Sequence, residues 1–226
     1  MTTLLIATRN AHKVGEIQAI LGPRFRFRTL NDFPGAPQVV EDAATLAGNA
    51  TKKAVELARW LAHSAPAARP DWVLADDSGL EVDALLGAPG VHSARFAALD
   101  SAAAAATGNS PDADNNAKLL RRLHAVPEAR RTGRFRCVIA LVAVPAASAE
   151  NVSPVCYAEE FAAQICEGAC EGRIQTAPTG QGGFGYDPLF VPAGHSQSFA
   201  ELGEAIKNQL SHRAKALEKL KAILPA

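Results

Sequence analysis

Apolar and polar positions along the first third of the chain follow two different periods. A short apolar run at residues 4–8 predicts a buried strand, and apolar side chains then recur at helical spacing until Gly22 and Pro23. A second helix is predicted from about residue 45 to residue 63, and a strand at 72–75 that leads into a polar cluster. This order of strands and helices is typical of an α/β protein.

The pattern changes in the second half of the chain. Residues 97–116 are rich in alanine and then in turn-forming residues, which indicates a surface insertion, and a short helix around 119–123 follows. Residues 135–144 are the most apolar stretch and predict a central strand, with 155–165 as its hairpin partner. Because helices alternate with strands early and a hairpin comes later, we expect a mixed β-sheet in an α/β fold.

Composition and charge narrow the class of protein. The chain has 226 residues, 48% of them hydrophobic and 20% charged, which predicts one folded domain and excludes a disordered chain. Lys plus Arg and Asp plus Glu number 23 each, so no global field favours nucleic acid. No run approaches the roughly 18 apolar residues of a membrane helix. The apolar run at residues 4–7 is short and no basic segment precedes it, which is not the pattern of a signal peptide. We therefore expect a cytoplasmic protein without membrane or nucleic-acid partners.

The spacing of the four cysteines indicates neither a metal site nor a disulfide framework. Cys137, Cys156, Cys166 and Cys170 contain no CxxC pair, which favours buried or inert thiols over a disulfide framework or metal ligands.

A candidate anion site lies where the first strand turns into the first helix. Asn10 is a good helix cap, and the first-turn amides, the helix dipole, Thr8 and Lys13 converge there. The alternative is an ordinary turn with a solvated lysine. The six residues of this turn are Thr8, Arg9, Asn10, Ala11, His12 and Lys13.

Two adjacent carboxylates follow the strand at 72–75. Magnesium prefers such oxygen ligands and keeps several waters, so one carboxylate of Asp76 and Asp77 could hold Mg²⁺ while the other takes a proton from water. Strand alternation would point them apart unless the chain is turning there. Glu41 could add a third acidic group, and Ser78 a donor for phosphate. Alternatively, residues 76–79 form a solvated loop.

A glycine-rich segment at residues 180–185 formally contains GxGxxG. Tyr186 and Asp187 followed by Pro188 stand where a dinucleotide-binding helix would begin, which excludes that interpretation. Phe184, Tyr186 and Asp187 instead suit a planar ligand, with an aromatic face and a carboxylate. The alternative is a tight hairpin whose aromatic side chains lie in the core.

The last predicted helix starts at Ser211, a natural cap. His212 and Arg213 then occupy its first turn, which is unfavourable for cations and indicates an anionic or acceptor-rich partner. Lys207 could join them. A solvated basic helix start is the alternative.

These pieces, in this order, resemble the inosine/xanthosine triphosphate pyrophosphatase family. The matching segments are residues 7–13, 75–96, 171–174, 182–190 and 211–213. The resemblance implies a single domain over residues 1–226, with an elongated mixed α/β fold and two lobes around a central active-site cleft. It also implies a homodimer and Mg²⁺-dependent hydrolysis of ITP, dITP and XTP to the nucleoside monophosphate and pyrophosphate.

The same resemblance assigns roles to individual residues. Asp77 would be the general base, with Glu41, Asp76 and Asp77 holding magnesium. The remaining residues would bind substrate: the triphosphate at residues 8–13, phosphate at Ser78, the nucleotide pocket at Phe184, Gly185, Tyr186, Asp187 and Lys207, and the base at His212 and Arg213.

Three positions depart from the family pattern. Ala43 stands where glycine is usual, Gly48 where an acidic residue is usual, and Thr179 where a basic residue is usual. The first two make the role of Glu41 less secure, and the third bears on phosphate contacts. The insertions around 102–113 and 157–163 have no assigned role.

Base chemistry agrees with the resemblance. The 6-oxo group of inosine and xanthosine can accept from Arg213, whereas adenine presents a donor there. Guanine must be excluded through its 2-amino group. A pyrophosphatase of the related septum-inhibitor type, acting on pyrimidine triphosphates, is disfavoured by the complete motifs at residues 184–187 and 211–213. A nucleotide-binding protein without activity is disfavoured by the intact acidic residues.

Overall fold

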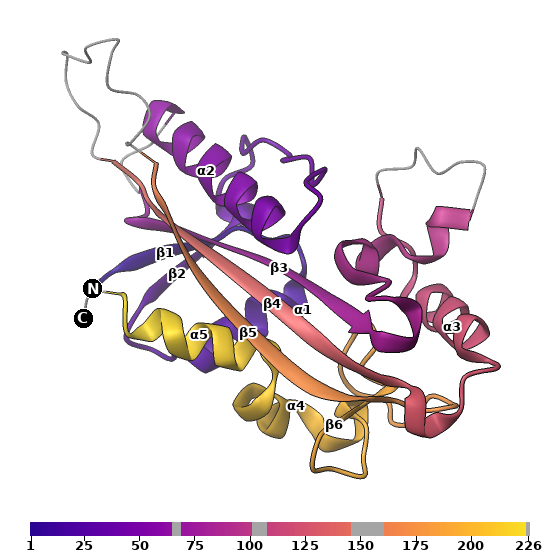
Figure 1. Cartoon of the computed structure of the whole chain (residues 1–226). Helices are drawn as coiled ribbons and strands as arrows, with labels where there is room; N and C mark the ends of the chain where they lie inside the picture. Colours follow the sequence, from indigo (N-terminus) through magenta and orange to yellow (C-terminus); the bar gives the residue numbers. More distant parts are fainter. Residues whose placement is uncertain (65–68, 101–107, 146–160, 225–226) are drawn as a thin grey trace. The chain divides into compact units, whose positions relative to one another are not determined.

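The structure is a computed structural model that describes residues 1–64, 69–100, 108–145 and 161–224 (Figure 1). Its strands are β1 (Thr3–Ile6), β2 (Arg26–Thr29), β3 (Trp72–Val82), β4 (Thr132–Ala143), β5 (Ala163–Ile174) and β6 (Phe190–Pro192). Its α-helices are α1 (Ala11–Leu21), α2 (Leu46–Ser64), α3 (Asp112–Leu123), α4 (Phe199–Leu210) and α5 (His212–Lys221).

The strands form one six-stranded sheet in the order β2-β1-β3-β4-β5-β6. β1 pairs in parallel with β2 and with β3, whereas β5 and β6 are antiparallel. The prediction of a mixed sheet in an α/β fold is therefore confirmed. Right-handed crossovers from β1 to β2 and from β2 back to β3 require their helices on opposite faces, and Figure 1 shows α1 and α2 on opposite sides of these strands.

The chain divides into two compact units. Unit 1 contains residues 1–77, 138–167 and 216–226, and unit 2 contains residues 78–137 and 168–215. The divisions fall inside β3, β4, β5 and α5.

Unit 1 is built on a parallel strand pair and an amphipathic helix. Leu4 and Leu5 of β1 are fully buried, as the apolar run predicts. The buried face of α2 repeats at helical spacing through Ala50, Ala54, Leu57, Ala58 and Leu61. Each buried leucine contributes about 1.5–3 kcal/mol relative to an exposed one, so this face fixes α2 against its unit.

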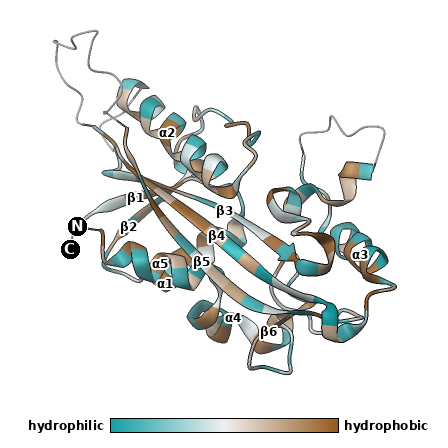
Figure 2. Cartoon of the chain, viewed as in Figure 1, coloured by the Kyte–Doolittle hydropathy of each residue, from teal (hydrophilic) through white to brown (hydrophobic). Residues whose placement is uncertain are grey.

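Unit 2 has an aromatic core. The rings of Phe135 and Phe190 lie 4.7 Å apart, and those of Phe190 and Phe199 lie 5.4 Å apart. α3 is largely hydrophilic in Figure 2 and buries only a narrow stripe, with Leu119 and Leu123 fully inaccessible.

Three predicted elements have different limits in the structure. β3 runs to Val82, so the polar cluster at residues 76–79 lies within a strand and not in a loop after it. α3 begins at Asp112, inside the predicted insertion, because acidic residues favour the amino-terminal turn of a helix. The hairpin partner predicted at 155–165 is β5, which starts at Ala163; residues 146–160 lie outside the described ranges, as do 101–107.

Two expectations from the sequence concern the cysteines and membrane-spanning helices, and both can be compared with the structure. Cys137, Cys166 and Cys170 are buried, which confirms the prediction of buried thiols for these three; Cys156 lies outside the described residues. Among the helices that the structure describes, none has the length and apolar character to cross a membrane.

Candidate active site

In unit 1, the first turn of α1 carries the predicted cap. The Asn10 side-chain oxygen accepts from the amides of His12 at 2.9 Å and Lys13 at 3.2 Å, and the Thr8 hydroxyl accepts from the Asn10 amide at 3.2 Å. The capping prediction is confirmed. Two first-turn amides thus already donate to Asn10, and the half-buried Lys13 adds a cationic side chain to this turn. Arg9, Ala11 and His12 are exposed on the same turn.

The two adjacent carboxylates of β3 have different partners. Lys13 Nζ donates to Asp76 Oδ1, and the Asp76 side chain is fully buried. Asp77 Oδ2 accepts from Asn49 Nδ2 at 3.1 Å. The strand therefore separates their contacts, which excludes the solvated-loop interpretation of this segment.

Lys53 of α2 lies among the acidic groups. Its Nζ donates to the backbone oxygen of Asp76 at 2.7 Å and lies 3.2 Å from Glu41 Oε2 and 4.0 Å from Asp77 Oδ1. Sequence reasoning missed both Lys53 and Asn49. The available signal was their spacing of four positions beside the apolar stripe of α2, where a helix places both on one face.

The surroundings of Asp77 change its acidity. Burial raises the pKa of its carboxyl, while the ammonium groups of Lys53 and Lys13 act in the opposite direction and the carboxylate of Glu41 raises the pKa further. The net pKa lies above the ordinary value of 3.8. A carboxylate that accepts a proton more readily than usual suits a general base.

The carboxylates of unit 1 fit a magnesium site whose remaining ligands are waters and substrate phosphates. Among the described residues, no three His, Cys, Asp or Glu side chains group closely enough to hold a metal alone. Mg²⁺ commonly takes only one or two protein carboxylates, keeps waters, and binds substrate phosphates for the rest. Glu41 and Asp77 both face the Lys53 ammonium, so they provide two hard oxygen donors on one side of this cluster.

The two departures beside Glu41 are coupled in space. A Cβ atom at position 48 would lie 2.7 Å from the Cβ of Ala43 and 3.1 Å from Thr45 Oγ1. The methyl group at position 43 therefore requires glycine at position 48. Ala43 also donates its amide to Asn49 Oδ1 at 2.9 Å, so this contact supports the residue that holds Asp77.

In unit 2, Arg213 is nearly inaccessible at 1% exposure and has the acceptor partner that its helix position predicts. Its Nη2 donates to the Ser78 hydroxyl at 3.1 Å. The Phe184 ring has two cations near it, Lys207 Nζ at 4.3 Å and Arg213 Cζ at 5.9 Å from its centroid. These contacts bring Ser78, Phe184, Lys207 and Arg213 together.

Asp187 fixes the glycine-rich loop to α4. Its Oδ2 accepts from Lys207 Nζ at 2.5 Å and from the Phe184 amide at 2.9 Å. Gly203, at φ +77°, interrupts the helical geometry of α4 ahead of Lys207.

Two predicted pocket residues lie in the core of unit 2. Tyr186 is buried, donates its hydroxyl to the backbone oxygen of Ser93 at 2.9 Å, and has a pKa raised by burial. The His212 ring stacks on Phe135 at 4.8 Å and an interplanar angle of 14°. The core interpretation of the loop aromatics therefore holds for Tyr186, whereas Phe184 is half-buried.

Thr179 anchors the start of the loop. Its hydroxyl lies 2.6 Å from Glu201 Oε2 and 2.7 Å from Gln175 Nε2. Glu201 in turn forms the capping box of α4 with Ser198. The residue that replaces the usual basic side chain thus joins the loop to α4.

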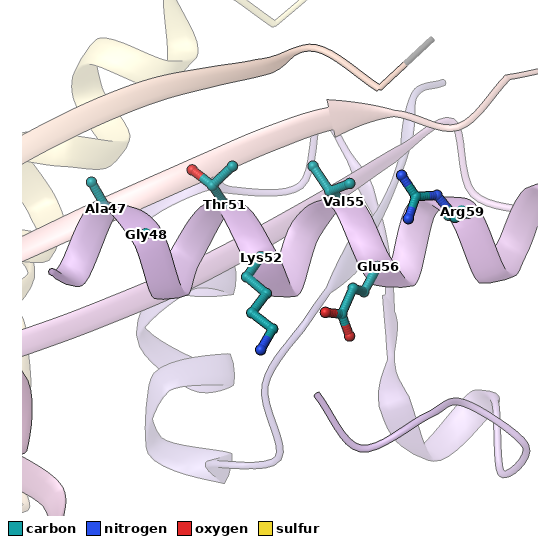
Figure 3. A pocket seen from close by; sticks show the side chains of 7 residues that line it. All are labelled: Ala47, Gly48, Thr51, Lys52, Val55, Glu56 and Arg59. Atoms are coloured by element: carbon teal, nitrogen blue, oxygen red, sulfur yellow. The ribbon is translucent and has the colours of Figure 1, made fainter. Parts of the chain in front are cut away.

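A hollow of about 500 Å³ lies on the exposed side of α2 (Figure 3). It is lined by Ala47, Gly48, Thr51, Lys52, Val55, Glu56 and Arg59, all from that helix. None of these is among the predicted site residues.

Fold and side chains together define a mixed α/β protein with buried carboxylates opposite lysines in one unit and a basic, aromatic cluster in the other. The model of the Ham1 family matches residues 4–223, and the chain belongs to this family. The inosine/xanthosine triphosphate pyrophosphatase resemblance is thereby confirmed.

Curated relatives and solved structures agree. The chain is 43% identical to a dITP/XTP pyrophosphatase of Shouchella clausii, covering 98% of this chain and 96% of the relative. It is 45% identical to a dITP/XTP pyrophosphatase of Geobacillus kaustophilus, covering 97% and 93%. A HAM1 protein structure from Coxiella burnetii matches with a TM-score of 0.76 and 34% identity over 99% of this chain and 98% of that one.

Proposed function

We propose that this protein hydrolyses non-canonical purine nucleoside triphosphates, namely ITP, dITP and XTP, to the nucleoside monophosphate and pyrophosphate. The observation that carries the proposal is family membership over nearly the whole chain, with relatives named dITP/XTP pyrophosphatase. Removal of such nucleotides from the pool is the corresponding cellular role.

The cluster in unit 1 supplies the hydrolytic chemistry of the proposal. Asp77 takes the proton of the attacking water, and its raised pKa makes it a better acceptor than an ordinary aspartate. The turn at residues 8–13 binds the triphosphate, with Lys13 as its point charge. Lys53, which also faces Glu41, holds Asp77 in its ionised form before substrate arrives.

Glu41 and Asp77 would hold Mg²⁺, with Asp76 beside them. When bound, the ion screens phosphate charge and polarises the phosphoryl oxygens. Asp76 contacts Lys13, so its role in the proposal includes placing this lysine for the phosphates. Glu41 is 39% exposed, which leaves its oxygens accessible to an ion from solvent.

The cluster in unit 2 recognises the nucleoside. Phe184 offers a ring face for stacking, and its loop residues Gly185, Tyr186 and Asp187 shape the pocket. Arg213 donates to the 6-oxo group of inosine or xanthosine, Lys207 contributes a polar contact to the nucleotide pocket, and Ser78 contacts phosphate. His212 supports this side through its stack on Phe135.

We place the enzyme in the cytoplasm as a homodimer, with a single domain spanning two lobes around a central cleft. A formal net charge of zero supports a small nucleotide over nucleic acid as the partner.

A panel of triphosphates tests the substrate class. With purified protein and Mg²⁺, kcat/KM for XTP, ITP and dITP should exceed that for ATP and GTP by at least about tenfold, the discrimination that about 1.4 kcal/mol provides. Pyrimidine triphosphates as the best substrates would favour the septum-inhibitor type instead. ATP turned over as fast as ITP would contradict the proposal.

A further inference from the structure

Both backbone polar groups of Gly185, in the glycine-rich loop, are hydrogen-bonded to side chains of α3. Asp112 Oδ2 accepts from the amide of Gly185 at 2.6 Å, and Asn116 Nδ2 donates to the carbonyl oxygen of Gly185 at 2.9 Å. The two residues lie one helical turn apart, so a single helix face satisfies both polar groups of this peptide position. Gly185 itself has φ +62°, a conformation that glycine adopts without strain.

The helix that carries this pair is itself firmly attached within unit 2. Leu119 and Leu123 are fully buried, and Lys118 Nζ donates to the backbone oxygen of Phe96 at 2.6 Å. Asn115 binds the segment before the helix by accepting from the Ala97 amide at 2.8 Å. Asp112 and Asn116 therefore act from a fixed support.

Gly185 stands between the two aromatic residues of the loop. Phe184 precedes it, with its ring near Lys207 and Arg213, and Tyr186 follows it and is anchored in the core through Ser93. The two hydrogen bonds fix the peptide groups on either side of Gly185, and a change in its φ and ψ angles would move Phe184 relative to the anchored Tyr186. Two hydrogen bonds thus fix the position of Phe184: its own amide donates to Asp187, and the amide of the next residue, Gly185, donates to Asp112 of α3.

We infer that Asp112 and Asn116 are positioning residues for base recognition, because they hold the backbone of Gly185 and thereby the neighbouring Phe184. This inference rests on the proposed function, because it assumes that Phe184 stacks on the base. Neither side chain needs to touch the nucleotide. Their loss should weaken contacts to the base while the phosphate chemistry of unit 1 is retained.

Steady-state kinetics of four variants test the inference. Each hydrogen bond is worth about 1 kcal/mol, so Asp112→Ala and Asn116→Ala should each raise KM for XTP about two- to tenfold with kcat little changed. Asp112→Asn keeps an acceptor oxygen and should recover most of the wild-type KM. Asp114→Ala removes an exposed acidic residue from the same helical turn and should match wild type.

A ligand without a base separates positioning from general damage. Inhibition by inorganic tripolyphosphate should be unchanged in Asp112→Ala and Asn116→Ala, and their melting temperatures should allow assay at 25 °C. Unchanged KM for XTP, or equal weakening of tripolyphosphate, would overturn the inference. Wild-type protein inactive on every triphosphate would instead contradict the proposed function, so the two failures are distinguishable.

Discussion

Lys53→Met is a sharp perturbation of the acidic cluster, because methionine keeps the length of the side chain and removes its charge. Lys53 Nζ lies 4.0 Å from Asp77 Oδ1, and both side chains are only 11% exposed. At an effective dielectric constant near 20, two unit charges at that distance attract by about 4 kcal/mol. Part of this attraction is offset by the desolvation of both ions.

The net cost follows from what remains around Asp77. Removing one partner of a buried pair typically costs about 3–5 kcal/mol, and Asn49 still donates to Asp77, so we expect about 3 kcal/mol. For a chain of 226 residues this corresponds to a melting temperature lower by about 6–12 °C. The pKa of Asp77 should also rise further, since Lys53 is the largest influence that lowers it.

Two measurements check this reasoning, thermal unfolding and the pH dependence of kcat/KM for XTP. The acidic limb of the pH profile should move to higher pH in Lys53→Met, because Asp77 must be ionised to accept a proton. Lys52→Met is the matched control: this lysine precedes Lys53 on α2 and pairs with the exposed Asp42. Equal melting temperatures and equal pH profiles for the two variants would refute the role of Lys53.

Three other predictions concern stability and reactivity. In metal-free buffer at pH 7, Asp77→Asn should unfold at a higher temperature than wild type, because burial raises the pKa of Asp77 and so disfavours its ionised form. Unlike Lys53→Met, this change leaves no unpaired charge, since Lys53 keeps Glu41 and the backbone oxygen of Asp76 as partners. The gain should vanish as the pH falls toward 3.8, and a lower melting temperature at pH 7 would contradict the prediction. Gly48→Ala should lower the free energy of unfolding in urea by about 1–3 kcal/mol, although alanine has the better helix propensity, because the new methyl group would meet Ala43. In an Ala43→Gly background the same change should be stabilising, and additive effects of the two substitutions would argue against the contact between positions 43 and 48. Burial raises the pKa of Cys170 to about 11, so labelling of this residue at pH 8, followed by mass spectrometry, should require denaturant; rapid native labelling would contradict the burial.

The sequence predicted those elements whose pattern is local. The apolar run at residues 4–8, the cap at Asn10 and the periodic stripe of α2 can each be recognised from neighbouring residues alone, and the structure confirms a strand at Thr3–Ile6, the cap and the helix. The strand around Asp76 and Asp77 could not be bounded in this way. Polar residues end a strand by local propensity, whereas here pairing with neighbouring strands continues β3 to Val82.

The candidate site shows the same division. Asp77, Lys13 and Arg213 stood out because their residue types and positions carry chemistry on their own. Lys53 is a different case, because a lysine on a helix is ordinarily solvated, and only packing shows that it faces Asp77. Contacts across long stretches of sequence, such as Asn116 to Gly185, leave no local pattern to read.

Product analysis of a single reaction shows which phosphoanhydride bond of the triphosphate the enzyme cleaves. Purified protein is incubated with XTP and Mg²⁺, and nucleotides, pyrophosphate and orthophosphate are quantified together. We expect equimolar xanthosine monophosphate and pyrophosphate with no orthophosphate, and a rate lower by a factor of about 10²–10⁴ in Asp77→Asn. Orthophosphate with xanthosine diphosphate as products, or an Asp77→Asn variant with wild-type rate, would contradict this expectation.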